Sequence, residues 1–171
     1  MTRQDGKRML LFILLIFWMG LIFFFSAKPA VQSAKMSTSV GKMIGRVVVP
    51  EFEEWSDTKQ DAFAKKIDFA VRKSAHACEY AVLSVLFFVN YKKKSRKIKQ
   101  IVGMSALSTA LYAVTDEIHQ LFVPGRSGQI TDVILDSCGG LIGAVLSAII
   151  LYLIRKRKKD EDSIQLWCRI A

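Results

Sequence analysis

Four long apolar blocks constrain the fold of this chain more than any other feature of its sequence. They cover Met9–Phe25, Ala75–Val89, Ile101–Val123 and Val133–Ile154. A soluble protein would spread such residues with helical or strand periodicity. A helix needs about 20 mostly apolar residues to cross a bilayer. The sequence therefore predicts an all-α integral membrane protein, a bundle of four transmembrane helices at about 9–27, 74–91, 101–123 and 132–154.

The first block is expected to remain a membrane helix rather than to be cleaved as a signal peptide. Its start is basic, with Arg3, Lys7 and Arg8. However, its apolar core exceeds the roughly 7–15 residues of a signal peptide, and no clean A-x-A cleavage site follows. We predict a single membrane domain over residues 1–154 and a basic cytoplasmic tail over 155–171.

The basic residues predict the orientation of the helices. The formal net charge is +10, and the cations cluster at Lys92–Lys99 and Arg155–Lys159. Cytoplasmic loops carry an excess of Lys and Arg, so we place both clusters and both termini in the cytoplasm. Binding to anionic lipid headgroups at the cytoplasmic face is compatible with the same residues. Nucleic-acid binding is not expected, because the chain has no soluble basic domain.

This orientation brings polar residues from three predicted helices to one depth on the extracytoplasmic side. They are Arg72, Lys73, His76, Glu79 and Tyr80 in the second helix, Tyr112, Asp116, Glu117, His119 and Gln120 in the third, Arg126 in the following turn, and Asp132 and Asp136 in the fourth. Most are spaced three or four residues apart, so each helix presents a polar face. Ionisable groups at membrane depth are costly and indicate a functional site.

Three interpretations of this polar cluster stay open. It is an ion-pair network that holds the bundle together, a divalent metal site, or a site of acid/base chemistry or anion binding. His76-x-x-Glu79 and Asp116-x-x-His119 resemble the carboxylate–His spacing of metal sites in helical bundles. Without a metal, His119 or His76 would be a general base, Glu79 or Asp116 would orient it, and Arg126 would clamp a phosphate or carboxylate. No cofactor is assumed.

The extracytoplasmic segment between the first two membrane helices is predicted to be amphipathic and helical. Its apolar residues at helical spacing are Val31, Met36, Val40, Met43, Ile44, Val47 and Val48. Such a helix could lie in the membrane interface or cover the polar cluster. Pro50 should end it, and Ser56 or Asp57 could cap a second helix that carries Phe63, Ile67 and Val71 and runs into the next membrane helix.

Gly139 and Gly143 are four residues apart in the fourth predicted helix. This spacing allows another helix to approach closely, so we expect a packing role for both glycines.

Several motifs resemble those of the VanZ-like membrane protein family. They are Arg72-Lys73-Ser74-Ala75-His76-x-x-Glu79-Tyr80, Tyr112-Ala113-x-x-Asp116-Glu117-x-His119-Gln120-x-Phe122-x-Pro124-Gly125-Arg126, Ile130-x-Asp132-Val133-x-x-Asp136 and Gly139-Gly140. Phe25-Ser26-Ala27-Lys28-Pro29 is less closely similar. The resemblance spans roughly residues 9–154 and implies a small multi-helix protein of the bacterial cytoplasmic membrane. The founding member of that family is associated with resistance to the glycopeptide teicoplanin.

We expect the protein to act at the extracytoplasmic leaflet on a cell-envelope lipid or lipid-linked precursor, with a contribution to teicoplanin resistance. The expected catalytic residues are His76, Glu79, Asp116, His119 and Arg126, and the other eight residues of the cluster would bind or orient. One alternative is a non-enzymatic binder or envelope-assembly accessory protein whose polar cluster is structural. A second is a small transporter that acts as an oligomer.

Overall fold

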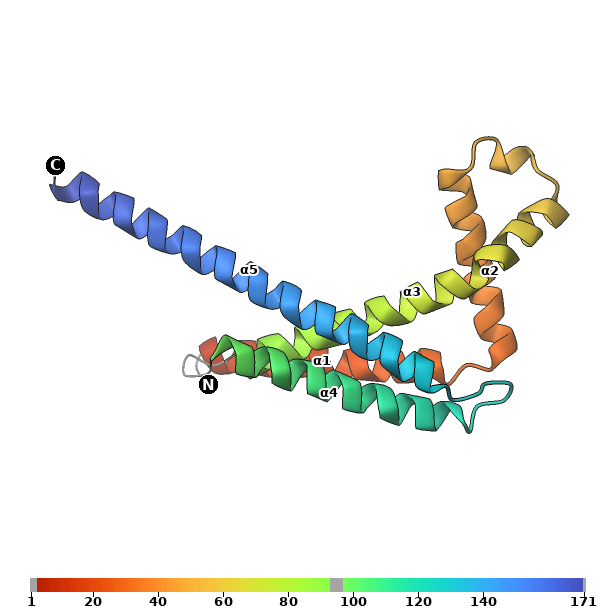
Figure 1. Cartoon of the computed structure of the whole chain (residues 1–171), viewed down its shortest axis with the longest axis horizontal. Coiled ribbons are helices and arrows are strands. Elements are labelled where there is room, and N and C mark those ends of the chain that lie inside the picture. Colours follow the sequence, from red (N-terminus) through yellow and green to blue (C-terminus); the bar gives the residue numbers. More distant parts are fainter. Residues whose placement is uncertain (1–2, 93–96, 171) are drawn as a thin grey trace.

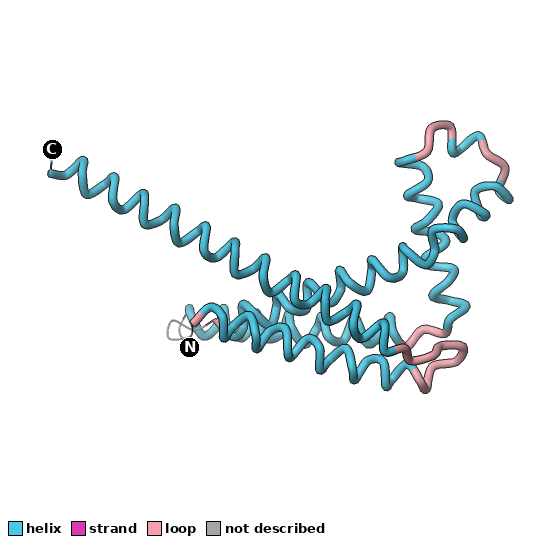
Figure 2. Tube along the Cα trace, in the orientation of Figure 1, coloured by secondary structure: helices cyan, strands magenta, loops and turns pink. Residues whose placement is uncertain are grey.

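The computed structural model describes residues 3–92 and 97–170, and all regular structure in these ranges is helical. The elements are α1 (Arg3–Ser26), α2 (Ala30–Val48), the short 3-10 helix η1 (Phe52–Glu54), α3 (Asp57–Tyr91), α4 (Ile98–Gln120) and α5 (Ile130–Ile170). Loops are confined to the joins between helices (Figure 2). The prediction of an all-α chain is confirmed.

Helix α3 is the centre of the arrangement, because it contacts α1, α2, α4 and α5. Its second half lies in a bundle with α1, α4 and the first part of α5 (Figure 1). Its first half leaves the bundle and, with α2 and η1, forms an arm that projects at one end (Figure 1). The α1–α2 connection and the α4–α5 loop lie at that same end of the bundle.

The helix boundaries follow local sequence signals. As predicted, the segment before residue 74 and the following apolar block form one continuous helix, α3. α2 ends at Val48, two residues before Pro50. Ser56 is the N-cap residue of α3, as one of the two predicted candidates, but its side chain makes no capping hydrogen bond. The residues after 154 continue α5 as a helix.

Helix α4 ends at Gln120, three residues earlier than predicted. Residues 121–125 instead form turns, and Gly125 adopts a left-handed backbone conformation with φ of 74°. Pro124 explains the early end, because a proline disfavours the helical conformation of the residue before it. The apolar side chains of Leu121 and Phe122 therefore belong to the loop, where they are exposed.

Helices α1 and α5 are each long and apolar enough to cross a membrane, over Gln4–Ser26 and Ile130–Asp162. Both expose large apolar side chains along their length, including Phe12 and Phe17 of α1 and Leu146 of α5. Exposed apolar surface of this extent is typical of contact with lipid. That α3 and α4 also cross the bilayer stays a prediction, and so does the interfacial position of α2.

Close packing between α3 and α5 depends on two glycines, as predicted. A Cβ atom at Gly139 would collide with the carbonyl of Ala77, and one at Gly143 with the carbonyl of Ala81. Gly140 lies against α4, where an added Cβ atom would collide with the side chain of Thr109. Small residues at these positions let the backbones approach, which holds the polar faces of the three helices at one height.

The projecting arm has its own contacts. Gly41 of α2 lies against Ala64 of α3, and Phe52 of η1 packs under Gly45. An ion pair joins Lys42 Nζ to Asp61 Oδ1 at 2.7 Å, and Lys42 lowers the pKa of the exposed Asp61 carboxyl. The arm is therefore a packed helical pair rather than a loose linker.

Candidate functional site

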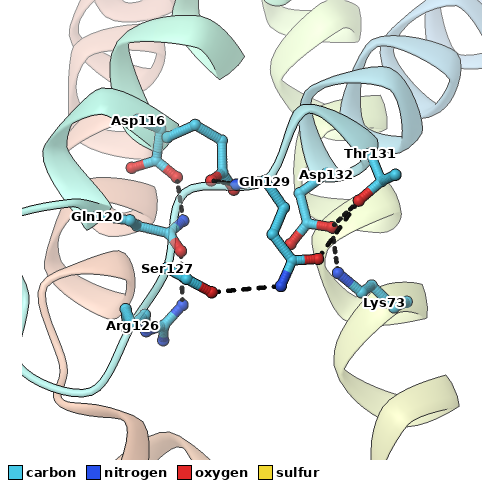
Figure 3. Close-up of polar contacts among 9 residues, drawn as sticks. Lys73, Asp116, Gln120, Arg126, Ser127, Gln129, Thr131 and Asp132 are labelled. Atoms are coloured by element: carbon cyan, nitrogen blue, oxygen red, sulfur yellow. Dashed lines mark hydrogen bonds and ion pairs between the residues drawn. The ribbon is translucent and has the colours of Figure 1, made fainter.

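A row of hydrogen bonds links α3, α4 and the loop after α4. Asp116 is buried, with 3% of its surface exposed. Its Oδ2 accepts a hydrogen bond from the Tyr80 hydroxyl at 3.1 Å and another from Gln120 Nε2 at 3.2 Å. Gln120 Oε1 in turn accepts one from Arg126 Nη1 at 3.1 Å (Figure 3). The buried carboxylate thus fixes the amide that holds the guanidinium.

Arg126 is half-buried and has uncharged partners in this row. Its Nε donates to the carbonyl of Lys28 at 3.2 Å, in addition to the bond to Gln120. Among the described residues it forms no ion pair. Burial lowers the pKa of the guanidinium, and the nearby Asp116 carboxylate opposes that shift. A partly desolvated cation with neutral partners favours an anionic ligand.

Glu117 has a structural role. Its Oε2 accepts a hydrogen bond from the backbone N–H of Gln129 at 2.9 Å. Gln129 directly precedes α5, whose first N–H groups have no partner within the helix and carry the positive end of its dipole. Glu117 therefore caps α5 and joins the end of α4 to the start of α5.

Ion pairs connect the polar faces of the helices. Lys73 of α3 pairs with Asp132 of α5 (Figure 3). Arg72 pairs with Asp68, one turn earlier on α3, at 2.7 Å, and Asp68 also accepts a hydrogen bond from Ser37 of α2. Asp136 lies one turn beyond Asp132 and is 1% exposed.

Two of the predicted site residues contact α1, and one of them, Tyr112, also lies against Tyr80 of α3, with ring centroids 6.3 Å apart. The Tyr112 hydroxyl donates to the carbonyl of Met19 at 2.6 Å. The His119 ring lies against Phe23, with ring centroids 4.2 Å apart. Tyr112 and His119 therefore help to position α1.

The metal interpretation has no geometric support. Within the described residues, no group of three or more His, Cys, Asp or Glu side chains is arranged to hold a metal ion. His76 and Glu79 lie on α3, whereas His119 packs on α1. Sequence spacing placed these residues on polar faces but did not fix the distances between the faces.

A large apolar pocket lies between the arm and the bundle. Its volume is about 650 Å³. Its walls are formed by α2, α3, the C-terminal end of α1 with the residues that follow it, and Arg126 of the α4–α5 loop. The apolar lining includes Met36, Val40, Ile44, Ile67 and Val71. Lys28, Arg72, His76, Glu79 and Arg126 supply ionisable groups to the same walls. This volume is in the usual range for a small-molecule or lipid site.

A second, smaller pocket adjoins it. Its volume is about 190 Å³, and its lining is mainly polar, with Lys73, Gln120, Ser127, Gln129 and Asp132. Four residues line both pockets, namely Ser33, Arg72, His76 and Arg126. The two hollows therefore meet at a boundary of two arginines and a histidine.

A family model described as VanZ/LLP1 matches residues 11–152. The chain belongs to this family. No curated protein and no solved structure matches the chain. Family membership and the two candidate membrane spans together support a membrane protein.

Of the predicted cluster, the structure brings Arg72, Lys73, His76, Glu79, Gln120, Arg126 and Asp132 to the pockets. Tyr80, Asp116, Glu117 and Asp136 are not among the lining residues. Lys28 and Asp68 were not predicted as site residues. The pocket-lining face of α2, with Met36, Val40 and Ile44, corresponds to the apolar face that was predicted to lie in the membrane interface or to cover the polar cluster. Asp68 was detectable, because it is one turn before Arg72 on the same helix. Lys28 gave a weaker signal, directly after the first apolar block.

Proposed function

We propose that this VanZ/LLP1 family member takes a cell-envelope lipid or lipid-linked precursor into the site from the extracytoplasmic leaflet and acts on its headgroup. The observation that carries the proposal is the junction of the two pockets. An apolar pocket that joins a polar one at Arg72, His76 and Arg126 has the polarity of an amphiphile. Apolar walls would hold a tail, and the polar groups would orient a headgroup.

His76 and Glu79 are the residues we assign to chemistry. They line the apolar pocket one turn apart on α3, and an imidazole and a carboxylate are the usual proton carriers of enzymes. Asp116 acts indirectly, through the hydrogen bonds that position Gln120 and Arg126. His119 is not assigned a catalytic role, because its ring packs against Phe23.

The alternative of a non-enzymatic binder is favoured by the contribution of α2. This helix lines the apolar pocket with Ser33, Met36, Ser37, Val40 and Ile44. In that case the pocket would capture the amphiphile, and His76 and Glu79 would serve recognition only.

Lipid retention tests the proposal. Ala70 lines the apolar pocket, whereas Ala62 lies two turns earlier on α3 and is exposed outside it. We expect the purified wild-type protein to retain a defined lipid, measured by mass spectrometry of extracted lipids. Ala70→Phe should remove that lipid by filling the pocket, and Ala62→Phe should retain it. Equal retention by both variants would overturn the proposal.

A cellular readout separates chemistry from capture. We expect His76→Ala and Glu79→Gln to retain the lipid but to lose teicoplanin tolerance conferred in a susceptible host, at equal amounts of membrane protein. Arg46→Gln, a change on the outer surface of α2, should keep the tolerance. Loss of the lipid together with the tolerance in both site variants favours the binder, and tolerance retained in both would contradict the chemical role.

A further inference from the structure

Positive side chains of the site line the pockets, whereas most of its carboxylates are buried. The ionisable side chains that line the two pockets, besides His76, are the cations Lys28, Arg72, Lys73 and Arg126 and the carboxylates Glu79 and Asp132. Asp116, Glu117 and Asp136 are buried behind them. Carboxylates dominate the cluster as it stands in the sequence, but cations dominate the surface that a ligand would touch.

Two of these cations, Lys28 and Arg126, are available to a ligand. Lys73 is paired with Asp132, and Arg72 with Asp68. Lys28 Nζ lies over the rings of Phe24 and Phe25, at 5.0 and 4.8 Å from their centroids, and 3.4 Å from the sulfur of Met36. Within the described part of the chain, neither Lys28 nor Arg126 forms an ion pair.

Arg126 is held in place with donors to spare. A guanidinium carries five N–H donors, and the hydrogen bonds to Gln120 and to the Lys28 carbonyl use Nη1 and Nε. The second of these bonds joins the Arg126 side chain to the backbone of Lys28, and the Lys28 side chain lines the same pocket. An arginine oriented in this way suits two-pronged recognition of a phosphate.

We propose that the ligand is an amphiphile with a phosphate head and an aliphatic tail, with the phosphate held by Arg126 and Lys28 and the tail in the apolar pocket between α2 and α3. This inference rests on the proposed function and names the chemical class of its ligand. An uncharged glycan head would give the half-buried Arg126 no directly bonded anion, because among the described residues its hydrogen-bond partners are the Gln120 amide and the Lys28 carbonyl. A phosphate monoester carries about −1.5 to −2 charges at neutral pH, which matches two cations better than one carboxylate does.

Defined vesicles test this inference. The full-length protein is reconstituted in phosphatidylcholine vesicles that contain a minor fraction of phosphatidic acid, and the lipids that stay bound are counted by native mass spectrometry. We expect phosphatidic acid to be enriched over its share in the vesicle by roughly tenfold, a factor that corresponds to about 1.4 kcal/mol. Arg126→Gln and Lys28→Gln should each remove the enrichment. Lys28→Gln is included because, in the described part of the chain, the interactions of that ammonium group are with two rings and a thioether, so its loss should leave the fold intact.

Arg46→Gln is the matched control, because it removes a positive charge from α2 at a position that lines neither pocket. It should retain the enrichment. Bound lipid in the same proportions as the vesicle would overturn the phosphate assignment while the proposed function stands, provided that Ala70→Phe still removes lipid. Displacement of phosphatidic acid by millimolar inorganic phosphate would show a simple anion site and overturn the assignment of an amphiphile.

Discussion

Asp116 shows how one buried carboxylate organises the candidate site. It receives hydrogen bonds from Tyr80 of α3 and from Gln120 of its own helix, and so fixes the distance between the two helices at this height. The sequence predicted that these residues belong to one cluster, because they share helix faces. It could not predict that Asp116 would lie behind the pocket or that His119 would pack on Phe23. Such partners depend on the rotation of each helix about its axis.

Asp116→Ala should destabilise the protein by about 1–3 kcal/mol, because the Tyr80 hydroxyl would lose its acceptor in a buried position. Tyr80→Phe should cost about 1 kcal/mol, since the carboxylate keeps its bond to Gln120. Denaturant unfolding in detergent micelles, followed by circular dichroism, measures both values. Thr115→Ala is the control: its exposed hydroxyl bonds only within α4, and we expect less than about 0.5 kcal/mol. A loss as small in Asp116→Ala would contradict the role given to this carboxylate.

At the scale of elements, the sequence predicted most of the helices and several of their ends. The apolar blocks correspond to α1, α4, the second half of α3 and the first part of α5. The early end of α4 was missed because the apolar residues Leu121–Val123 continue the hydropathy pattern into a turn. The sequence predicted an apolar face of α2 that could cover the cluster, but it could not predict the size of the pocket, which depends on the angle at which the arm leaves the bundle.

Gly143→Ala should destabilise the α3–α5 contact. The added methyl group would meet the backbone of Ala81, which no side-chain rotation can relieve, and overpacking of this kind costs about 1–3 kcal/mol. Gly20→Ala is the matched change in α1, where nothing lies within 4 Å of the new Cβ atom. There we expect a gain of up to about 1 kcal/mol from helix propensity. Thermal unfolding in micelles measures the stability of both variants. Equal changes in stability for Gly143→Ala and Gly20→Ala would contradict the packing role of Gly143.

The whole molecule has two chemically distinct ends. The site, the arm and the α4–α5 loop lie at one end of the bundle, and the end of α3 and the start of α4 lie at the other (Figure 1). Which of these ends faces the cytoplasm stays a prediction from the basic clusters. Membrane crossing by all four helices rests on hydropathy and on the positive-inside rule.

Reporter fusions test that topology. An enzyme that is active only outside the cytoplasm should be active when fused after Gly128 and inactive when fused after Lys99 or at the C-terminus, because basic segments stay in the cytoplasm. A reporter that is active only in the cytoplasm should give the reverse pattern. Activity of the first reporter after Lys99 would show that the orientation is wrong and would move the site to the other face.

The length of α5 has a consequence for the side of the membrane that is predicted to be cytoplasmic. The helix has 41 residues, and its last part stands clear of the bundle (Figure 1). At 1.5 Å per residue, the part beyond residue 154 extends about 24 Å, close to three Debye lengths at physiological ionic strength. With Ile154 at the membrane surface, Arg155–Lys159 lies within the electrostatic reach of lipid headgroups, whereas the far end of the helix is screened from them. Raising the salt concentration should therefore weaken only the contact between Arg155–Lys159 of α5 and the lipid headgroups.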